Sequence, residues 1–238
     1  QALTTAQVAG MSSGQIKSLT TAQVAGLSMA QVKALETEDL AEMTTDQIAA
    51  LSAANVAALS TNQVTNMKTA QVAALTGAQV KTLTTAQVAA MTTAQIRALT
   101  TGQFSVLEAD DFTAMNSSQI AALTDTQIGN LSTAQLKAID AVDLKSMTAT
   151  QIGLLTSAQT AVLTAEQLSS LNSAQIAAFS AAEITGLSAA QIRSLTTAQT
   201  AGIDATLMAA IETGDVSAIS AAAFKGLSNA ALGAITTA

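Results

Sequence analysis

The sequence gathers many of its acidic residues into four short segments, and paired carboxylates are the side chains here best suited to chemistry. The segments are ETEDLAEM (36–43), EADDFTAM (108–115), DAVDLKSM (140–147) and ETGDVSAI (212–219). Glu36 with Asp39, and Glu108 with Asp111, are spaced so that their oxygens could bind Ca²⁺, which takes several oxygen ligands. A second interpretation is that acids in the first turn of a helix suit the helix dipole. Because no EF-hand spacing or Gly-Asp-rich nonapeptide accompanies these acids, we assign no metal ligand and no cofactor.

Eight of the nine basic residues occupy one position of an eight-residue repeat that is described below. They are Lys17, Lys33, Lys81, Arg97, Lys137, Lys145, Arg193 and Lys225, whereas Lys68 lies elsewhere in its repeat. This shared position indicates a site that faces solvent. The alternative is a spaced cationic row that binds an anionic surface, either a cell-surface polysaccharide such as lipopolysaccharide or a neighbouring subunit.

The rest of the composition offers little to catalysis. Because His and Cys are absent, no catalytic triad, thiol nucleophile or His-ligated metal site can form. None of the 12 Gly begins a phosphate-binding G-x-x-x-x-G-K pattern, and four Phe are the only aromatic residues for stacking sugars or bases. The net charge of −7 has the wrong sign for binding a phosphate backbone. We therefore expect neither an enzyme nor a nucleic-acid partner.

One eight-residue phrase recurs from end to end, as in LTTAQVAGM (3–11), LTGAQVKTL (75–83) and LTTAQIRAL (91–99). Counting from Leu3 in steps of eight gives 30 positions, all of which are Leu, Met, Ile or Phe. Counting from Val8 gives 29 positions, of which only Thr160 and Thr200 are not apolar. No insertion or deletion breaks the register, which indicates one structural unit that is stacked many times.

Each repeat carries the start signal of a helix. Ser, Thr, Asp or Asn follows the Leu in 26 of 30 cases, and Gln comes three residues later in 20 of 29. This is the capping box. In it the cap hydroxyl accepts a hydrogen bond from the N3 backbone N–H, and the Gln side chain accepts one from the backbone N–H of the cap residue. The Leu before the cap and the Val or Ile after the Gln are placed as the two ends of a hydrophobic staple.

Geometry argues against a continuous helix, a coiled coil or a strand with this eight-residue period. In one continuous helix the apolar pair would drift by about 80° per repeat, so no apolar face would persist. A coiled coil would need about 4.0 residues per turn, which is outside its accessible range. The apolar spacings of five and three are both odd, so the anchors would alternate between the faces of a strand.

The remaining prediction is an all-α solenoid of very short capped helices, one per repeat, with a core of Leu and Val. We expect a single domain over 1–238, with degenerate repeats from about 201–238 as a terminal cap or a link to another module. The spacing of Met at the Leu position favours three to four repeats per superhelical turn. Small residues late in the repeat, among them Ala34, Ala50, Gly186 and Gly202, would allow successive segments to approach closely.

Three features concern the cellular setting. The longest strictly apolar run, LMAAI (207–211), is far shorter than the roughly 18–20 residues that span a bilayer. The sequence has no start Met and no basic–apolar leader, so we expect a processed chain or an excised fragment. A chain without Cys is compatible with secretion.

The LTTAQ(V/I)AAL phrase resembles the tandem octapeptide repeats of large bacterial secreted or cell-surface proteins that are adhesin-like or surface-layer-like. The resemblance covers essentially the whole chain and weakens after about Thr200, in DATLMAAI, SAAAFKGL and SNAALGAI. The LTxxQ core is also similar to that of periplasmic chaperones of the Spy type, which carry it once or twice on long helices. In this chain the similarity is therefore evidence for the helix cap and hardly for chaperone function. The resemblance implies a bacterial, extracellular, structural protein, and it carries over no functional residue.

These features together predict a non-enzymatic structural protein of the bacterial cell surface or extracellular matrix. We expect it to associate with itself into a homo-oligomer or polymer, such as an S-layer-like sheet, a filament or a stalk. The alternative is a binding module, either an adhesin segment or a scaffold that presents a ligand on one solenoid face.

Overall fold

The computed structural model describes residues 3–235, which contain 29 short helices and no strand. Each helix spans four to six residues and begins just after the cap position of one repeat, as the sequence predicts. The chain falls into two compact units, 1–115 and 116–238, and each is described by itself. The expectation of a single domain stays a prediction.

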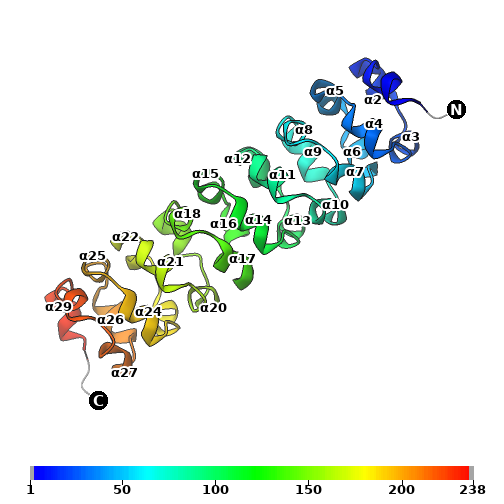
Figure 1. Ribbon diagram of the computed structural model, residues 1–238. Helices are drawn as coiled ribbons and strands as arrows, with labels where there is room; N and C mark the ends of the chain where they lie inside the picture. The colour runs from blue at the N-terminus through cyan, green and yellow to red at the C-terminus, as the bar shows by residue number, and fades with distance from the viewer. Residues whose placement is uncertain (1–2, 236–238) are drawn as a thin grey trace. The chain divides into compact units, whose positions relative to one another are not determined.

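The first unit contains helices α1 to α14 (Figure 1). Their bounds are Thr5–Ala9, Ser13–Ser18, Thr21–Ala25, Met29–Lys33, Thr37–Glu42, Thr45–Ala50, Ala53–Ala57, Thr61–Thr65, Thr69–Ala74, Gly77–Lys81, Thr85–Ala90, Thr93–Ala98, Thr101–Ser105 and Ala109–Ala114.

The second unit contains helices α15 to α29. Their bounds are Ser117–Ala121, Asp125–Gly129, Thr133–Ala138, Ala141–Leu144, Ala149–Ile152, Ser157–Thr160, Ala165–Ser170, Ser173–Ala177, Ala181–Thr185, Ala189–Ser194, Thr197–Thr200, Ala205–Ala210, Thr213–Val216, Ala221–Phe224 and Asn229–Gly233. The degenerate repeats after residue 200 therefore continue the same pattern of helices.

The capping box forms as predicted, and helix α12 shows how it sets the length of a helix. The backbone N–H of Gln95 donates to Thr92 Oγ1 at 3.2 Å, and the N–H of Thr92 donates to Gln95 Oε1 at 2.8 Å. The helix ends at Ala98, its C-cap residue Leu99 is extended, and the next N-cap residue, Thr100, is extended as well. Two extended residues between helices α12 and α13 thus bend the chain at this junction.

Within each unit a helix packs against the helix three repeats further along the chain, as α9 packs on α12 and α18 on α21. Hydrogen bonds between successive turns link residues 28 to 31 apart. Twenty-eight residues are three and a half repeats, in agreement with the three to four inferred from the Met spacing. We call each such turn of the solenoid a coil.

The two apolar positions of the repeat form the core of each unit. In the inner coils, Val and Ile at the second position are almost completely buried, and Leu and Met at the first position are buried as well. In the first unit, the rings of Phe104 and Phe112 meet edge to face, with centroids 5.4 Å apart. The two polar exceptions are also buried, and Thr200 Oγ1 donates to the carbonyl oxygen of Ala223 at 2.6 Å.

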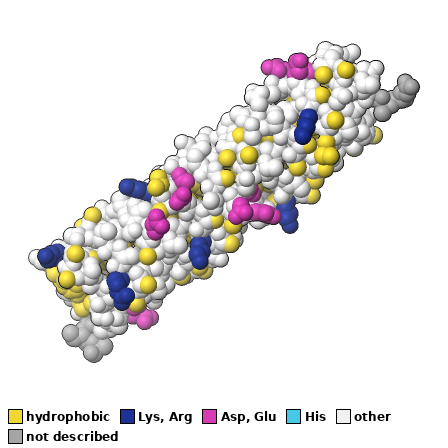
Figure 2. All heavy atoms as spheres, viewed as in Figure 1, with side chains coloured by type: hydrophobic (Ala, Val, Ile, Leu, Met, Phe, Trp, Pro, Cys, Tyr) yellow, Lys and Arg dark blue, Asp and Glu magenta, His cyan; other side chains and the backbone are white. Residues whose placement is uncertain are grey.

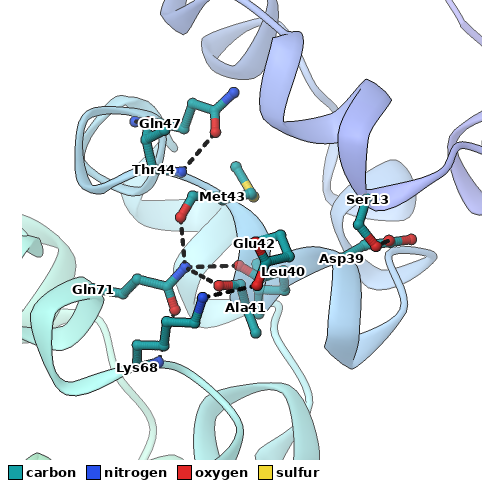
Figure 3. Close-up of polar contacts among 10 residues, drawn as sticks. All are labelled: Ser13, Asp39, Leu40, Ala41, Glu42, Met43, Thr44, Gln47, Lys68 and Gln71. Atoms are coloured by element: carbon teal, nitrogen blue, oxygen red, sulfur yellow. Dashed lines mark hydrogen bonds and ion pairs between the residues drawn. The ribbon is translucent and has the colours of Figure 1, made fainter.

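Within each unit, inner Gln side chains join two coils, which the sequence did not reveal. Gln71 Oε1 accepts from the N–H of Lys68, its own cap residue, at 2.8 Å. Gln71 Nε2 donates to the carbonyl oxygens of Leu40 and Met43, both at 2.8 Å (Figure 3). These carbonyls lie at the end of helix α5 in the preceding coil. One amide side chain thus hydrogen-bonds a backbone N–H at the start of one helix and backbone carbonyls at the end of another.

At Gly202 the structure confirms the predicted close approach of successive coils. A Cβ atom added there would lie 2.2 Å from the carbonyl oxygen of Ser173, and backbone cannot move aside cheaply. At Gly77, by contrast, an added Cβ would meet nothing within 4 Å.

We expect Gly202→Ala to lower the free energy of unfolding by about 1–3 kcal/mol, since overpacking forces the two coils apart. Urea titration followed by circular dichroism measures this change, with Gly77→Ala as the matched control. Because Ala favours helix over Gly, the control should leave stability unchanged or slightly raised. Equal midpoints for the two variants would show that the coils have room at Gly202.

Candidate functional site

The acidic repeats are the principal candidate site, and the structure places their carboxylates in different environments. Glu36 is the cap residue of helix α5 and makes no side-chain cap hydrogen bond. Asp39, three residues later, is buried at the Gln position and accepts a hydrogen bond from Ser13 Oγ at 2.7 Å (Figure 3). Glu38 is fully exposed, and hydrogen bonds from its own backbone N–H and from Thr37 Oγ1 lower its pKa.

In two of the acidic repeats, the acid that replaces Gln accepts a hydrogen bond from a Ser hydroxyl of the preceding coil. An Asp carboxylate has no proton to donate, so it cannot cap carbonyls as the Gln amide does. Ser13 donates to Asp39, and Ser117 donates to Asp143 at 2.5 Å, in each case from 26 residues earlier. These contacts give buried Asp39 and half-buried Asp143 a structural role at the boundary between coils.

Asp111 accepts no hydrogen bond from a side chain within residues 3–235. It is 5% exposed, and its Oδ2 accepts from the backbone N–H of Glu108 at 2.9 Å. Burial raises the pKa of Asp111, and the neighbouring charges of Glu108 and Asp110 raise it further against the effect of that hydrogen bond. The ionised carboxylate is therefore unfavourable in this fold.

We expect Asp111→Asn to raise the free energy of unfolding by about 1 kcal/mol at pH 7, because it removes a buried charge and adds a donor. Asn55 shows the expected contact, since its Nδ2 donates to the carbonyl oxygen of Leu27, 28 residues earlier, at 2.9 Å. Leu83 stands at the same separation from Asp111. Urea midpoints of both chains measure the gain.

The gain from Asp111→Asn should depend on pH. A carboxyl whose folded pKa is raised stabilises the fold only when protonated, and it loses that contribution as the pH rises through the folded pKa. The gain should thus be full at pH 7 and shrink towards pH 3. Asp46→Asn, at an exposed site, is the control and should change little at either pH. A gain that is the same at pH 3 and pH 7 would exclude burial of the charge as its cause.

The described residues bring together no three acidic side chains that could hold a metal ion. Glu42, the last acid of the first cluster, pairs instead with Lys68 Nζ at 2.9 Å, and this hydrogen bond and charge lower the pKa of Glu42 (Figure 3). Both side chains are about half exposed, so the pair adds little to stability. We base no calcium proposal on the acidic repeats.

The eight basic residues at the shared repeat position are all exposed, which agrees with a solvent-facing site. Neighbouring coils bring together residues about 24 to 32 apart, and only Arg193 and Lys225 have such a separation. The face drawn in Figure 2 shows Lys and Arg side chains standing apart from one another. The structure gives no sign of a continuous cationic row within either unit.

Among residues 3–235, no helix has the length and apolar character that crossing a bilayer requires. A comparison with curated proteins finds no match to this chain. The family model described as ALTTAQ repeat matches the chain several times, over residues 1–29, 32–69, 66–101, 78–108, 104–141 and 208–238. These matches cover most of the sequence and fall on the short helices described above. The chain therefore belongs to the ALTTAQ repeat family.

Proposed function

We propose that the chain is a non-enzymatic structural protein of the bacterial cell surface or extracellular matrix, and that it associates with itself into a sheet, filament or stalk. The observation that supports this most is the repetition of one contact: in each unit, Gln side chains join successive coils by donating to the carbonyl oxygen 28 residues earlier. A coil built this way presents similar outer groups at fixed intervals, which suits regular association.

Composition supports the non-enzymatic part of the proposal, since the chain contains no His or Cys and its acids are spread over separate repeats. The location at the cell surface rests on the resemblance of the LTTAQ(V/I)AAL phrase to repeats of secreted bacterial proteins. The exposed basic residues would additionally allow contact with an anionic polysaccharide of the cell surface.

Negative-stain microscopy of the purified chain, with and without Ca²⁺, tests the proposal. We expect sheets or fibres that form as the protein concentration rises. Uniform monomers under every condition would contradict it and favour the alternative, a binding scaffold or adhesin segment that presents a ligand on one face.

A further inference from the structure

Glu183 interrupts the series of Gln side chains that joins coils in the second unit. It occupies the Gln position of helix α23 and is 5% exposed. Its Oε2 accepts a hydrogen bond from the backbone N–H of Ser180, its own cap residue, as the Oε1 atom of a Gln does in other repeats. The capping box is therefore complete, and the remaining oxygen, Oε1, takes the place of the Gln Nε2 group.

The neighbouring repeats show which contact between coils is missing at Glu183. In the next repeat, Gln191 Nε2 donates to the carbonyl oxygen of Leu163, 28 residues earlier, at 2.8 Å, and the preceding repeat makes the same contact. The residue 28 positions before Glu183 is Leu155. Its carbonyl oxygen accepts no hydrogen bond within residues 3–235. An ionised Glu183 has no hydrogen to offer this carbonyl.

The surroundings of Glu183 offer its carboxylate no positive charge. Helix α23 packs against α20 and α26, and neither helix carries a titratable side chain. Asp204, the N-cap residue of α26, is itself an acid, and its side chain accepts from the N–H of Leu207. Between Glu166 and Arg193, Glu183 is the only charged residue of the sequence. The ionised carboxylate is therefore buried without a counter-charge, which is costly.

A Ser hydroxyl is present at the separation that serves another acidic repeat. Ser157 lies 26 residues before Glu183, as Ser13 does before Asp39. The Ser157 hydroxyl, however, makes no hydrogen bond within the part of the chain that the structure describes, and the residue is exposed. Glu183 keeps its bond to the cap N–H instead, so its carboxylate stays at the boundary between coils.

We propose that Glu183 forms a pH-sensitive contact between two coils of the second unit. When the carboxyl group is protonated, Oε1–H donates to the carbonyl oxygen of Leu155 and replaces the donor that Gln supplies in the repeats on either side. When it is ionised, the donor is lost and two oxygens face each other. The coils are thus held together more tightly in acid than at neutral pH. The contact acts within one chain and does not depend on self-association.

A proton suits this position better than a metal ion does. The equivalent Gln191 amide lies 3.0 Å from the carbonyl oxygen of Thr160 and 2.8 Å from that of Leu163, which are ordinary hydrogen-bond lengths. The corresponding oxygens near Glu183 are the carbonyls of Ile152 and Leu155. Together with Oε1 they make three, whereas Ca²⁺ takes about six to eight oxygen ligands.

The test compares the full chain with its Glu183→Gln variant at a concentration where both are monomeric. Gln keeps the acceptor for the cap N–H and supplies at every pH the donor that Glu183 has only when protonated. We expect the variant to melt about 3 °C or more above the parent chain at pH 7, and within about 1 °C of it at pH 3. The difference disappears in acid because the proton makes a contact that exists only in the folded chain.

Two control variants separate this contact from other effects. Glu166→Gln removes the same charge at an exposed first-turn position, so it should change the melting temperature by no more than about 1 °C at either pH. Ser157→Ala removes the hydroxyl nearest in the repeat register to Glu183. It should also leave the melting temperature at pH 7 within about 1 °C of the parent chain.

Three outcomes would overturn the proposal. Equal melting temperatures of the parent and Glu183→Gln at pH 7 would show that the ionised carboxylate does not weaken the boundary. The same gain at pH 3 as at pH 7 would show that the protonated carboxyl does not donate to Leu155. A clear fall in melting temperature for Ser157→Ala at pH 7 would show that this hydroxyl donates to the ionised Glu183, as Ser13 does to Asp39.

Discussion

Leu99→Asp is expected to lower the free energy of unfolding by about 2–5 kcal/mol or more. Leu99 is 4% exposed and lies between helices α12 and α13, so the change truncates a core side chain and buries a charge. Thermal and urea unfolding followed by circular dichroism measure the loss.

The control for Leu99→Asp is Thr101→Asp, two residues further on at an exposed first-turn position. There an acid suits the helix dipole, so stability should change by no more than a few tenths of a kcal/mol, about the size of a surface effect. Similar losses for both variants would mean that the Leu position does not face a packed core.

Gln95→Glu is the second change with a large expected effect, and it alters a single group. Gln95 is 1% exposed, and its Nε2 donates to the carbonyl oxygens of Val64 at 2.8 Å and Met67 at 2.7 Å. Glu has the same shape and still accepts from the cap, but it sets a buried negative charge against these two carbonyls. We expect a loss of about 3–5 kcal/mol at pH 7, measured from urea midpoints.

Two comparisons show whether the lost donors cause the effect of Gln95→Glu. Gln15→Glu makes the same substitution where Nε2 has no partner within the described residues, so it should cost close to nothing. Thr92→Ala removes only the cap hydroxyl of the same helix and should cost about 1 kcal/mol. A loss at Gln95 no larger than that of Thr92→Ala would contradict a role for its amide between coils.

Local features of the helices could be predicted because their signals lie within one repeat. The capping box of Thr92 and Gln95 spans four residues, and the anchors Ile96 and Leu99 follow at once. Helix starts, the apolar core and the solenoid class therefore all follow from the sequence. The number of repeats per turn was indicated only by the spacing of Met.

The contact between coils was missed because it joins residues 28 to 31 apart and leaves no local spacing. One signal for it was present. A capping box accepts Glu as readily as Gln, yet 20 of 29 repeats have Gln and only one, at Glu183, has Glu. A preference for the amide over the carboxylate indicates that a donor is needed as well as an acceptor.

The surroundings of the acidic repeats could not be predicted from the sequence for the same reason. The sequence places Asp39 three residues after Glu36, which made a shared cation plausible, but it does not show that Asp39 faces Ser13 of the preceding coil. The direction of a side chain at the Gln position is set by the neighbouring coil. The candidate metal pairs are instead part of the boundary between coils.

The most direct test of the amide contact between coils is hydrogen exchange of Gln side-chain amides, followed by NMR at a concentration where the chain is monomeric. Both Nε2 protons of Gln95 should exchange at least about tenfold more slowly than those of Gln15, because the coils must part before exchange can occur. Equal exchange rates for Gln95 and Gln15 would contradict the account, since an amide that only caps its own helix leaves its Nε2 protons open to water.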